Sequence, residues 1–383
     1  MRYLRLLLVT VGIPCFAAAA HAQEKPPERA AAQQMKREKA LRDKDKFNLL
    51  SPYFKSWLNE DALFLISAEG RRRFLDLASD NERLEFIGQF WRNRSLDPDR
   101  IENVFEEEYY RRFVYANQNF GGHWDGWKTD RGRLYIMLGP PEEIDSYPAH
   151  TSCFDPAHSN ETTSDAPTRI TWKYRNLFGN GEDFDVWFAQ GEFGTTEADE
   201  STFQFSMEPC RFVPRPIEGG VEGIFAAVLT AEKKYRDFDL ANNSPSAVRQ
   251  AHPKNRDLEI LLNSRGERTQ FPLRVLFDEH LATKITRVAS VRLAIRPYAK
   301  GSTASAAIYG RFMNMATGEI EAQFELSVFP IRSETRSPEW IELCDKYIPL
   351  QRGNYELQIA VKDAARGEVA THYSQVLISD AAN

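Results

Sequence analysis

Acidic, imidazole and aromatic side chains concentrate in one short stretch, residues 121–143, with the sequence GGHWDGWKTDRGRLYIMLGPPEE. His123, Asp125, Asp130 and Glu142 are of the types that perform general acid–base chemistry, provided that they converge in a cleft that a substrate can reach. The stretch therefore raises the hypothesis of a hydrolase. The chain has no HExxH, GxSxG, Walker, CxxC or EF-hand motif, which argues against the commonest hydrolase and nucleotide-binding classes.

The same stretch also suits recognition of a ligand or a partner. Aromatic and polar residues on loops commonly bind other molecules, and here they are His123, Trp124, Asp125, Trp127 and Asp130. Binding by this loop is the second hypothesis.

The favoured interpretation of the stretch is structural, with the motif residues shaping a junction between a helix and a strand. These residues are Gly126, Trp127, Thr129, Asp130, Gly132, Gly139, Pro140 and Pro141. Gly126 permits a tight turn that seats Trp127, and Gly132 lets the chain pass close to a neighbour, expected to be the Trp127 ring. The two prolines should end the following strand, because neither can donate to a ladder.

The motif resembles a known family. Gly126-Trp127-Lys128-Thr129-Asp130, followed by Arg131-Gly132-Arg133 and Gly139-Pro140-Pro141, is similar to the GWxTD domain of exported bacterial proteins. The resemblance covers roughly residues 50 to 210, including "EFIGQFWRNRSLDPD" and "FEEEYYRRFVYANQNF" upstream and "TWKY" and "FDVWF" downstream. Residues 145–168 depart from it. The family implies no activity and no catalytic residues, so the resemblance defines a domain and leaves function open.

Helices should precede the motif. Residues 23–49 are rich in Ala, Lys, Arg and Glu, which predicts a linker or an exposed helix. Ser67 can cap a short helix, and Ser79 with Glu82 forms a capping box for the next one. Asp97-Pro98 should begin a longer helix that ends near residue 119. On that helix, the pairs Glu107–Arg111 and Glu108–Arg112 are typical of a solvated face.

Strand patterns dominate after the motif. Residues 132–138, 170–178, 183–190 and 202–207 predict a small antiparallel sheet, with a turn at Asn180-Gly181 and a long polar loop over 149–168. Proline and glycine at 209–220 indicate a boundary, with a connector helix predicted over 221–238. Eight further strands are predicted at 257–263, 271–278, 284–297, 305–314, 319–330, 340–348, 354–362 and 368–379, a spacing typical of an immunoglobulin-like β-sandwich.

These patterns predict an α+β protein of several parts. They are a signal peptide at 1–22, a linker at 23–49, a domain of helices and a small sheet at 50–215, a connector at 216–256 and a sandwich at 257–383. Arg2 and Arg5, the apolar residues 6–20 and the small residues around His21 predict export with cleavage after Ala22. A lipid anchor on Cys15 is disfavoured, because Pro14 stands where a small residue is expected.

The export signal predicts a periplasmic or secreted protein with no transmembrane segment in the mature chain. Its net charge of −6 becomes −8 when the two signal arginines are removed, so neither nucleic acid nor an anionic membrane is an expected partner.

Three cysteines remain after cleavage, and an oxidising compartment favours one disulfide among them. Cys153 with Cys210 is the preferred pair, although three pairings exist, and it leaves Cys344 as a lone thiol. His150, Cys153 and His158 could bind zinc, but their spacing matches no standard finger. No metal and no cofactor are therefore expected.

The leading hypothesis is a non-enzymatic binding or assembly module of the cell envelope, with an envelope protein or glycan as its partner. The alternative is a hydrolase of envelope polymers or peptides that uses His123 and the acidic residues near the motif.

Overall fold

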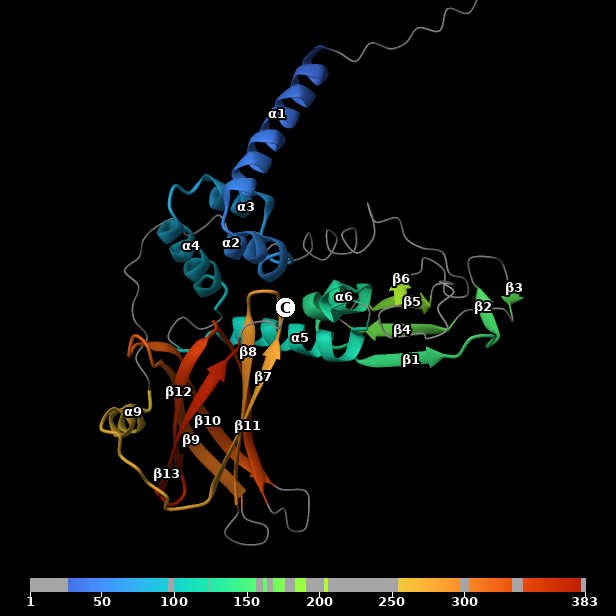
Figure 1. Ribbon diagram of the computed structural model, residues 1–383. Coiled ribbons are helices and arrows are strands. Elements are labelled where there is room, and N and C mark those ends of the chain that lie inside the picture. The colour runs from blue at the N-terminus through green and yellow to red at the C-terminus, as the bar shows by residue number, and fades with distance from the viewer. Residues whose placement is uncertain are drawn as a thin grey trace, which may run out of the picture. The chain divides into compact units, whose positions relative to one another are not determined.

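The computed structural model describes residues 27–95, 100–122, 124–155, 161–163, 168–175, 183–190, 203–205, 254–296, 303–332 and 340–379 (Figure 1). The chain divides into two compact units, Met1–Leu49 and Leu50–Asn383. The first contains helix α1 (Pro27–Leu49), in the segment predicted as a linker or exposed helix. Among the helices of the described residues, none has the length and apolar character needed to span a membrane. The predicted signal peptide, the boundary at 209–220 and the connector helix lie outside the described residues.

The second unit begins with a helical layer built on aromatic packing. Its elements are α2 (Pro52–Ser56), the π-helix η1 (Trp57–Asp61), α3 (Ala68–Asp76), α4 (Asp80–Arg92) and α5 (Val104–Phe120). The Trp57 ring lies 5.0 Å from Phe74 and 5.2 Å from Phe90 between centroids. The Ser67 cap and the capping box of Ser79 and Glu82 are confirmed.

The start of α5 differs from the prediction. The helix begins at Val104 instead of following Asp97-Pro98, whose residues lie outside those described. Asn103 is the cap, because its side-chain oxygen accepts from the Glu106 amide at 3.3 Å. Its side-chain nitrogen also donates to the Trp91 carbonyl at 2.7 Å, which ties the cap to α4. Tertiary contact thus fixes this helix end in place of the local Asp-Pro signal.

The strand predicted at 132–138 is wrong, because these residues lie in helix α6 (Asp130–Leu138). The 3-10 turn η2 (Gly126–Lys128) precedes the helix, and Gly139, with φ of 82°, ends it. The helix contacts α5, η2 and β6 (Phe203–Phe205) and is buried on more than one side. Leu134 and Ile136 are both buried although they lie two residues apart, which explains why the pattern resembled a strand.

A small sheet follows with the strand order β1-β4-β5-β6. It contains β1 (Glu143–Tyr147), β4 (Arg169–Tyr174) and β5 (Phe184–Gln190), all antiparallel. The predicted strands near 170, 183 and 202 are confirmed, and β1 takes the place of the mispredicted one. Trp172 of β4 packs at 5.3 Å from Phe120 and 5.0 Å from Phe188 between ring centroids. The region predicted as a polar loop holds a two-stranded pair, β2 (Cys153–Asp155) and β3 (Glu161–Thr163).

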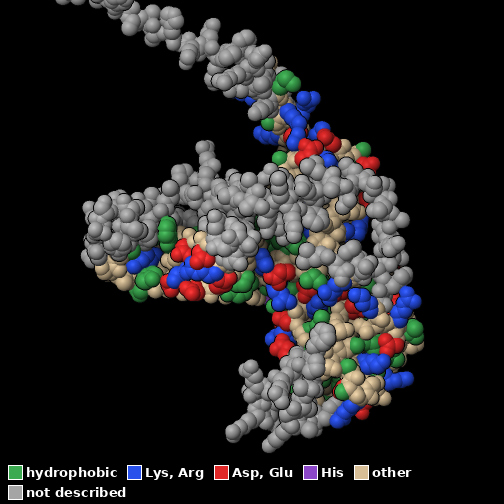
Figure 2. Space-filling model, turned by 180° about the vertical axis from the view of Figure 1, so that it is seen from behind, with side chains coloured by type: hydrophobic (Ala, Val, Ile, Leu, Met, Phe, Trp, Pro, Cys, Tyr) green, Lys and Arg blue, Asp and Glu red, His purple; other side chains and the backbone are tan. Residues whose placement is uncertain are grey.

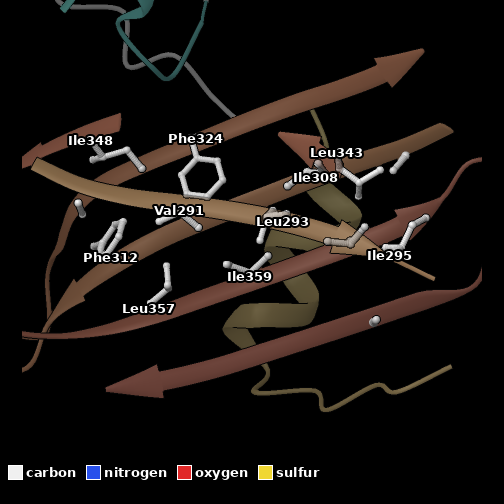
Figure 3. Close-up of a cluster of buried hydrophobic side chains, with 14 of the residues drawn as sticks. Val291, Leu293, Ile295, Ile308, Phe312, Phe324, Leu343, Ile348, Leu357 and Ile359 are labelled. Carbon is white, nitrogen blue, oxygen red and sulfur yellow. The ribbon is translucent and has the colours of Figure 1, made fainter. Parts of the chain in front are cut away.

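In its described residues, the C-terminal part is a sandwich of seven strands. Its strands are β7 (Leu273–Leu281), β8 (Arg287–Ile295), β9 (Thr303–Asn314), β10 (Ile320–Arg332), β11 (Ile341–Leu350), β12 (Gly353–Asp363) and β13 (Val369–Ile378). One sheet has the order β10-β9-β12-β13 and the other β11-β8-β7. Apolar side chains from both sheets form one core, shown in Figure 3, as expected for an immunoglobulin-like sandwich. The α+β fold class is therefore confirmed.

One predicted sandwich strand is wrong. Residues 257–263 lie in helix α9 (Arg256–Asn263). Leu258 and Leu262 are buried four residues apart against the sheet, whereas Ile260 between them is 65% exposed. This is the spacing of one helix face, so the short apolar run was assigned the wrong period.

Helix α5 connects the parts of the second unit. It packs against η2 and α6, and it also contacts strands β7, β8 and β11 of the sandwich. In Figure 1 the helix crosses one end of these strands before the chain reaches α6 and the small sheet. Residues at both ends of α5 are therefore placed to join the helical layer to the sandwich.

Candidate functional site

The motif residues form what we call the GWxTD corner, residues 121–139, where α5, η2 and α6 meet. Two backbone segments approach so closely here that no side chain fits between them. A Cβ built on Gly126 would lie 1.8 Å from the Ala116 carbonyl oxygen, and one on Gly132 would lie 1.8 Å from the Gly126 carbonyl oxygen. The close approach predicted for Gly132 is confirmed, but its neighbour is backbone and not the Trp127 ring.

Thr129 and Trp127 complete the corner. The Thr129 hydroxyl donates to the Gly126 carbonyl at 2.7 Å and accepts from the Gly132 amide at 3.0 Å, which caps α6. Trp127 is only 6% exposed and packs 6.0 Å from Phe113 between ring centroids. Its amide donates to the Asn117 side chain at 3.1 Å. The Thr129 hydroxyl and the Trp127 ring therefore both take part in the packing of the corner.

The remaining polar residues of the stretch are not brought together. Trp124 is 67% exposed, and exposed Asp125 pairs with Lys128 at 2.7 Å. Asp130 opens α6, which is about 12 Å long, and Glu142 follows its other end. Glu142 also accepts from the Arg175 amide at 3.1 Å. His123 lies outside the described residues, and over the described ranges the acids of this stretch form no cluster of three able to hold a metal ion.

A different polar cluster joins the helical layer to the sandwich, centred on Asp61. This carboxylate is fully buried and accepts hydrogen bonds from the hydroxyls of Tyr110 at 2.7 Å, Thr283 at 2.8 Å and Thr286. Burial raises its pKa to about 6, although the hydroxyl hydrogen bonds oppose that rise. Nothing in the local sequence marked Asp61, because its partners come from residues far along the chain.

Glu102, just before α5, and Glu107, near its start, each accept a hydrogen bond from the backbone of an edge strand of the sandwich. Strands β10 and β11 are edge strands of their sheets. The Glu102 carboxylate accepts from the Glu325 amide of β10 at 3.4 Å, and Glu107 accepts from the Tyr347 amide of β11 at 3.2 Å. Glu107 also pairs with buried Lys346 at 3.0 Å. The predicted solvated face is therefore wrong for Glu107, which is a buried contact with the sandwich.

Between these two contacts lies a cavity of about 390 Å³, which we call the α5 cavity. It is lined by Ile101, Glu102, Asn103, Glu106, Glu107, Ile320, Glu321, Ala322, Gln323, Phe324, Tyr347, Ile348 and Pro349. All four charged lining residues are glutamates. The volume is in the range of small-ligand sites, and no residue of the GWxTD corner contributes to it.

Glu106 is the unusual member of this lining. Burial and, secondarily, the charge of Asp61 raise its pKa to about 8. Within the described part of the chain, no group donates a hydrogen bond to its carboxyl, in contrast to Glu102 and Glu107. Glu106 is thus a mainly protonated acid at neutral pH that faces an open space.

A second charged surface covers the small sheet, where acidic and basic side chains intermingle in Figure 2. Lys173 lies 2.7 Å from Asp145 and 3.1 Å from Glu143, and Arg175 lies 3.1 Å from Asp183. Each of the two basic side chains is paired with acidic groups at the surface. They form a solvated face of exposed ion pairs, each of which contributes little to binding or stability.

The cysteines occupy different environments. Cys153 is disulfide-bonded, and because Cys210 lies outside the described residues, their pairing stays a prediction. Cys344 is a free cysteine whose pKa is raised to about 12 by burial, so its thiol stays protonated. Over the described ranges, no group of three or more His, Cys, Asp or Glu residues is placed to hold a metal ion.

Comparison with known proteins assigns the motif-bearing part of the chain. The family model of the GWxTD domain matches residues 51–176, so this segment is a GWxTD domain. No curated protein matches the chain.

Among solved structures, a beta-glucuronidase from glycoside hydrolase family 2 is similar at 14% identity and a TM-score of 0.21. That match covers 28% of this chain and spans only 11% of the other protein. At this level the likeness carries no argument about activity.

Proposed function

We propose that the protein is an exported, non-enzymatic binding or assembly module of the cell envelope, and that the α5 cavity is its ligand site. Export is inferred from the signal-like residues 1–22. The observation that carries the binding role is the cavity itself. It is ligand-sized, has apolar walls and convergent polar groups, and is framed by buried contacts.

The frame around the cavity is suited to hold a ligand in one geometry. Glu107, Lys346 and the Tyr347 amide fix the helix on the β11 side, and Glu102 with the Glu325 amide fixes it on the β10 side. Side chains held by several partners pay little additional entropy when a ligand binds. The GWxTD domain thus supplies one wall of a site whose other wall is the sandwich.

Retention of envelope material would test this proposal. Mature protein, residues 23–383, is immobilised and exposed to solubilised envelope glycans, peptides and proteins. The expected result is retention that is reduced by Ala322→Phe, which fills the cavity, and by Glu321→Arg, which changes its exposed rim. The control is Ala316→Phe, on an exposed turn of the same sheet. Retention that is absent, or equal in all four proteins, would refute a binding role for the cavity.

Export has its own test. The full chain, tagged at its C-terminus, is expressed in a bacterium, and the product is fractionated and its N-terminus sequenced. We expect a periplasmic or secreted product that begins at Gln23. A cytoplasmic product that retains Met1 would overturn the envelope assignment.

The hydrolase alternative has one observation in its favour. A carboxylic acid with a pKa of about 8, such as Glu106, has the protonation state that a general acid needs near neutral pH. Incubation of the mature protein with envelope polymers, followed by assay of new reducing ends and amines, would decide. Product formation that Glu106→Gln abolishes would replace the binding role by hydrolysis.

A further inference from the structure

The α5 cavity combines apolar walls with negative charge. Ile101, Ile320, Phe324 and Ile348 provide hydrocarbon surface, and Asn103 and Gln323 provide amides. Neither lysine, arginine nor histidine is among its lining residues. A site with this lining favours a ligand that carries positive charge on an aliphatic stem.

The four glutamates of the cavity are not equivalent. Glu102 lies 2.5 Å from Arg100, and Glu107 lies 3.0 Å from Lys346, so both have cationic partners. Glu106 and Glu321 have none among the described residues, and Glu106 is the deeper of the two, since Glu321 is exposed. Glu106 is half-buried, and a carboxyl that loses water without gaining a hydrogen-bond partner is destabilised. A cation in the cavity would supply that partner.

We propose that the α5 cavity binds an organic cation, an ammonium or guanidinium group on a short aliphatic stem, with Glu106 as its ionic partner and Glu321 at the rim. This inference rests on the proposed binding function and names its ligand class. The stem lies along Ile101, Phe324 and Ile348. The side-chain oxygens of Asn103 and Gln323, which already accept from the Glu106 amide and the Tyr309 hydroxyl, accept the remaining N–H groups with their second lone pairs. A metal ion fits less well, because the described residues place no three ligating groups together.

Proton release should accompany this binding. Glu106 is mainly protonated at neutral pH, and a cation binds its ionised form, so apparent affinity follows the ionised fraction of Glu106. With a pKa of about 8, that fraction rises from about 1% at pH 6 to about 50% at pH 8, which predicts roughly fiftyfold tighter binding. An alkylammonium keeps its own charge over this range, because its pKa is about 10.

Other ionisable groups lie near Glu106, and their charges affect its pKa. They are Asp61 of η1, Tyr53 of α2, Tyr110 of α5, the lining glutamates 102, 107 and 321, and Lys346 beside Glu107. Asp61 is the main charge that acts on Glu106. Removing that charge with Asp61→Asn should therefore move the midpoint of the binding curve to lower pH.

Calorimetry with n-butylammonium, n-butanol and butyrate tests the proposal on mature protein at constant ionic strength between pH 6 and 9. We expect butylammonium alone to bind, about fiftyfold more tightly at pH 8 than at pH 6. Glu106→Gln should lose this pH dependence and weaken binding at pH 8 at least tenfold. Glu108→Gln is the matched control, because Glu108 lies on the same helix outside the cavity and should leave binding unchanged.

Several results would overturn the proposal. They are equal binding of butanol, unchanged binding by Glu106→Gln, absence of binding at pH 9, and displacement of the amine by equimolar calcium. If Glu106→Gln does not fold by thermal melt, Glu321→Gln at the exposed rim takes its place, with a few-fold weakening expected. If the amine fails while envelope material is retained through the cavity, the cation class is wrong and the binding module stands. If the protein binds the amine but retains no envelope material, the proposed envelope function is refuted and the cation site in the α5 cavity stands.

Discussion

The GWxTD corner and the α5 cavity lie at the two ends of helix α5 and differ in how they are packed. The corner brings backbone against backbone, with glycines at 126 and 132 and a buried Trp127, and leaves no space. The start of α5 instead meets the sandwich through carboxylates and leaves an opening of about 390 Å³. The family motif therefore marks a folding junction, and the space for a ligand lies at residues that the motif does not include.

Removal of Trp127 should show the largest effect. Trp127→Ala deletes a buried ring that packs on Phe113 and should cost ~3–5 kcal/mol of unfolding free energy, measured by urea denaturation. The matched control is exposed Trp124→Ala, three residues away, with a change within ~0.5 kcal/mol. If the two variants lost equal stability, the corner would not be the buried junction described above.

The polar junction should be nearly as sensitive, for an electrostatic reason. Lys346→Met leaves Glu107 as a buried charge without its lysine, at a cost of ~3 kcal/mol. The double variant Glu107→Gln/Lys346→Met should recover much of that loss, because no charge stays buried. A double variant no better than the single one would mean that packing, and not the ion pair, holds this end of α5.

The unfolding free energy should also depend on pH, through two acids near the start of α5. The folded-state pKa values of Asp61 and Glu106 are raised to about 6 and about 8. The folded protein thus binds more protons than the unfolded chain between pH 4 and 8, and the unfolding free energy should fall over that window, by about 3 kcal/mol from Asp61 alone.

Chemical denaturation at pH 4.5, 6 and 8 would measure this fall. Asp61→Asn should remove its lower part and Glu106→Gln its upper part. Stability that instead rose with pH in the wild type would contradict the protonation states assigned here.

The smallest expected effect lies back in the corner. Thr129→Ala removes the cap of α6 and should cost ~1 kcal/mol, measured by thermal melt. Thr129→Ser keeps the hydroxyl and should retain most of the stability. An equal loss in both variants would show that the methyl group of Thr129, and not its hydrogen bonds, matters at this position.

Local signals in the sequence predicted most of the fold. Period-two patterns located the sandwich strands, and the caps at Ser67 and Ser79 were read correctly because each depends on neighbouring residues. The failures were short apolar runs. Helix α6 is buried on several sides, so its apolar pattern resembles that of a strand. Helix α9 does show a helical pattern, because buried Leu258 and Leu262 lie four residues apart, but its short apolar run also fits a strand.

The candidate site was predicted less well than the fold. The composition of the motif predicts a site at His123, Asp125, Asp130 and Glu142. Of these, Asp125, Asp130 and Glu142 lie in the described residues, and they form no cluster of three able to hold a metal ion. Asp61 and Glu106 were missed, because their environments arise from contacts with residues more than 200 positions away, such as Thr283, or from a cavity between two parts of the chain. No spacing of neighbouring residues can reveal a site of that kind.

The capping of edge strands by Glu102 and Glu107 has a consequence for association between molecules. The backbone amides of Glu325 and Tyr347 donate to Glu102 and Glu107. Without these carboxylates, the same amides could donate to the carbonyls of a strand from another chain and extend the sheets. With the carboxylates in place, one amide on each of these edge strands is already occupied. A sandwich produced without residues 102–107 would leave these two amides free, so this part of the GWxTD domain should also reduce edge-to-edge pairing with other copies.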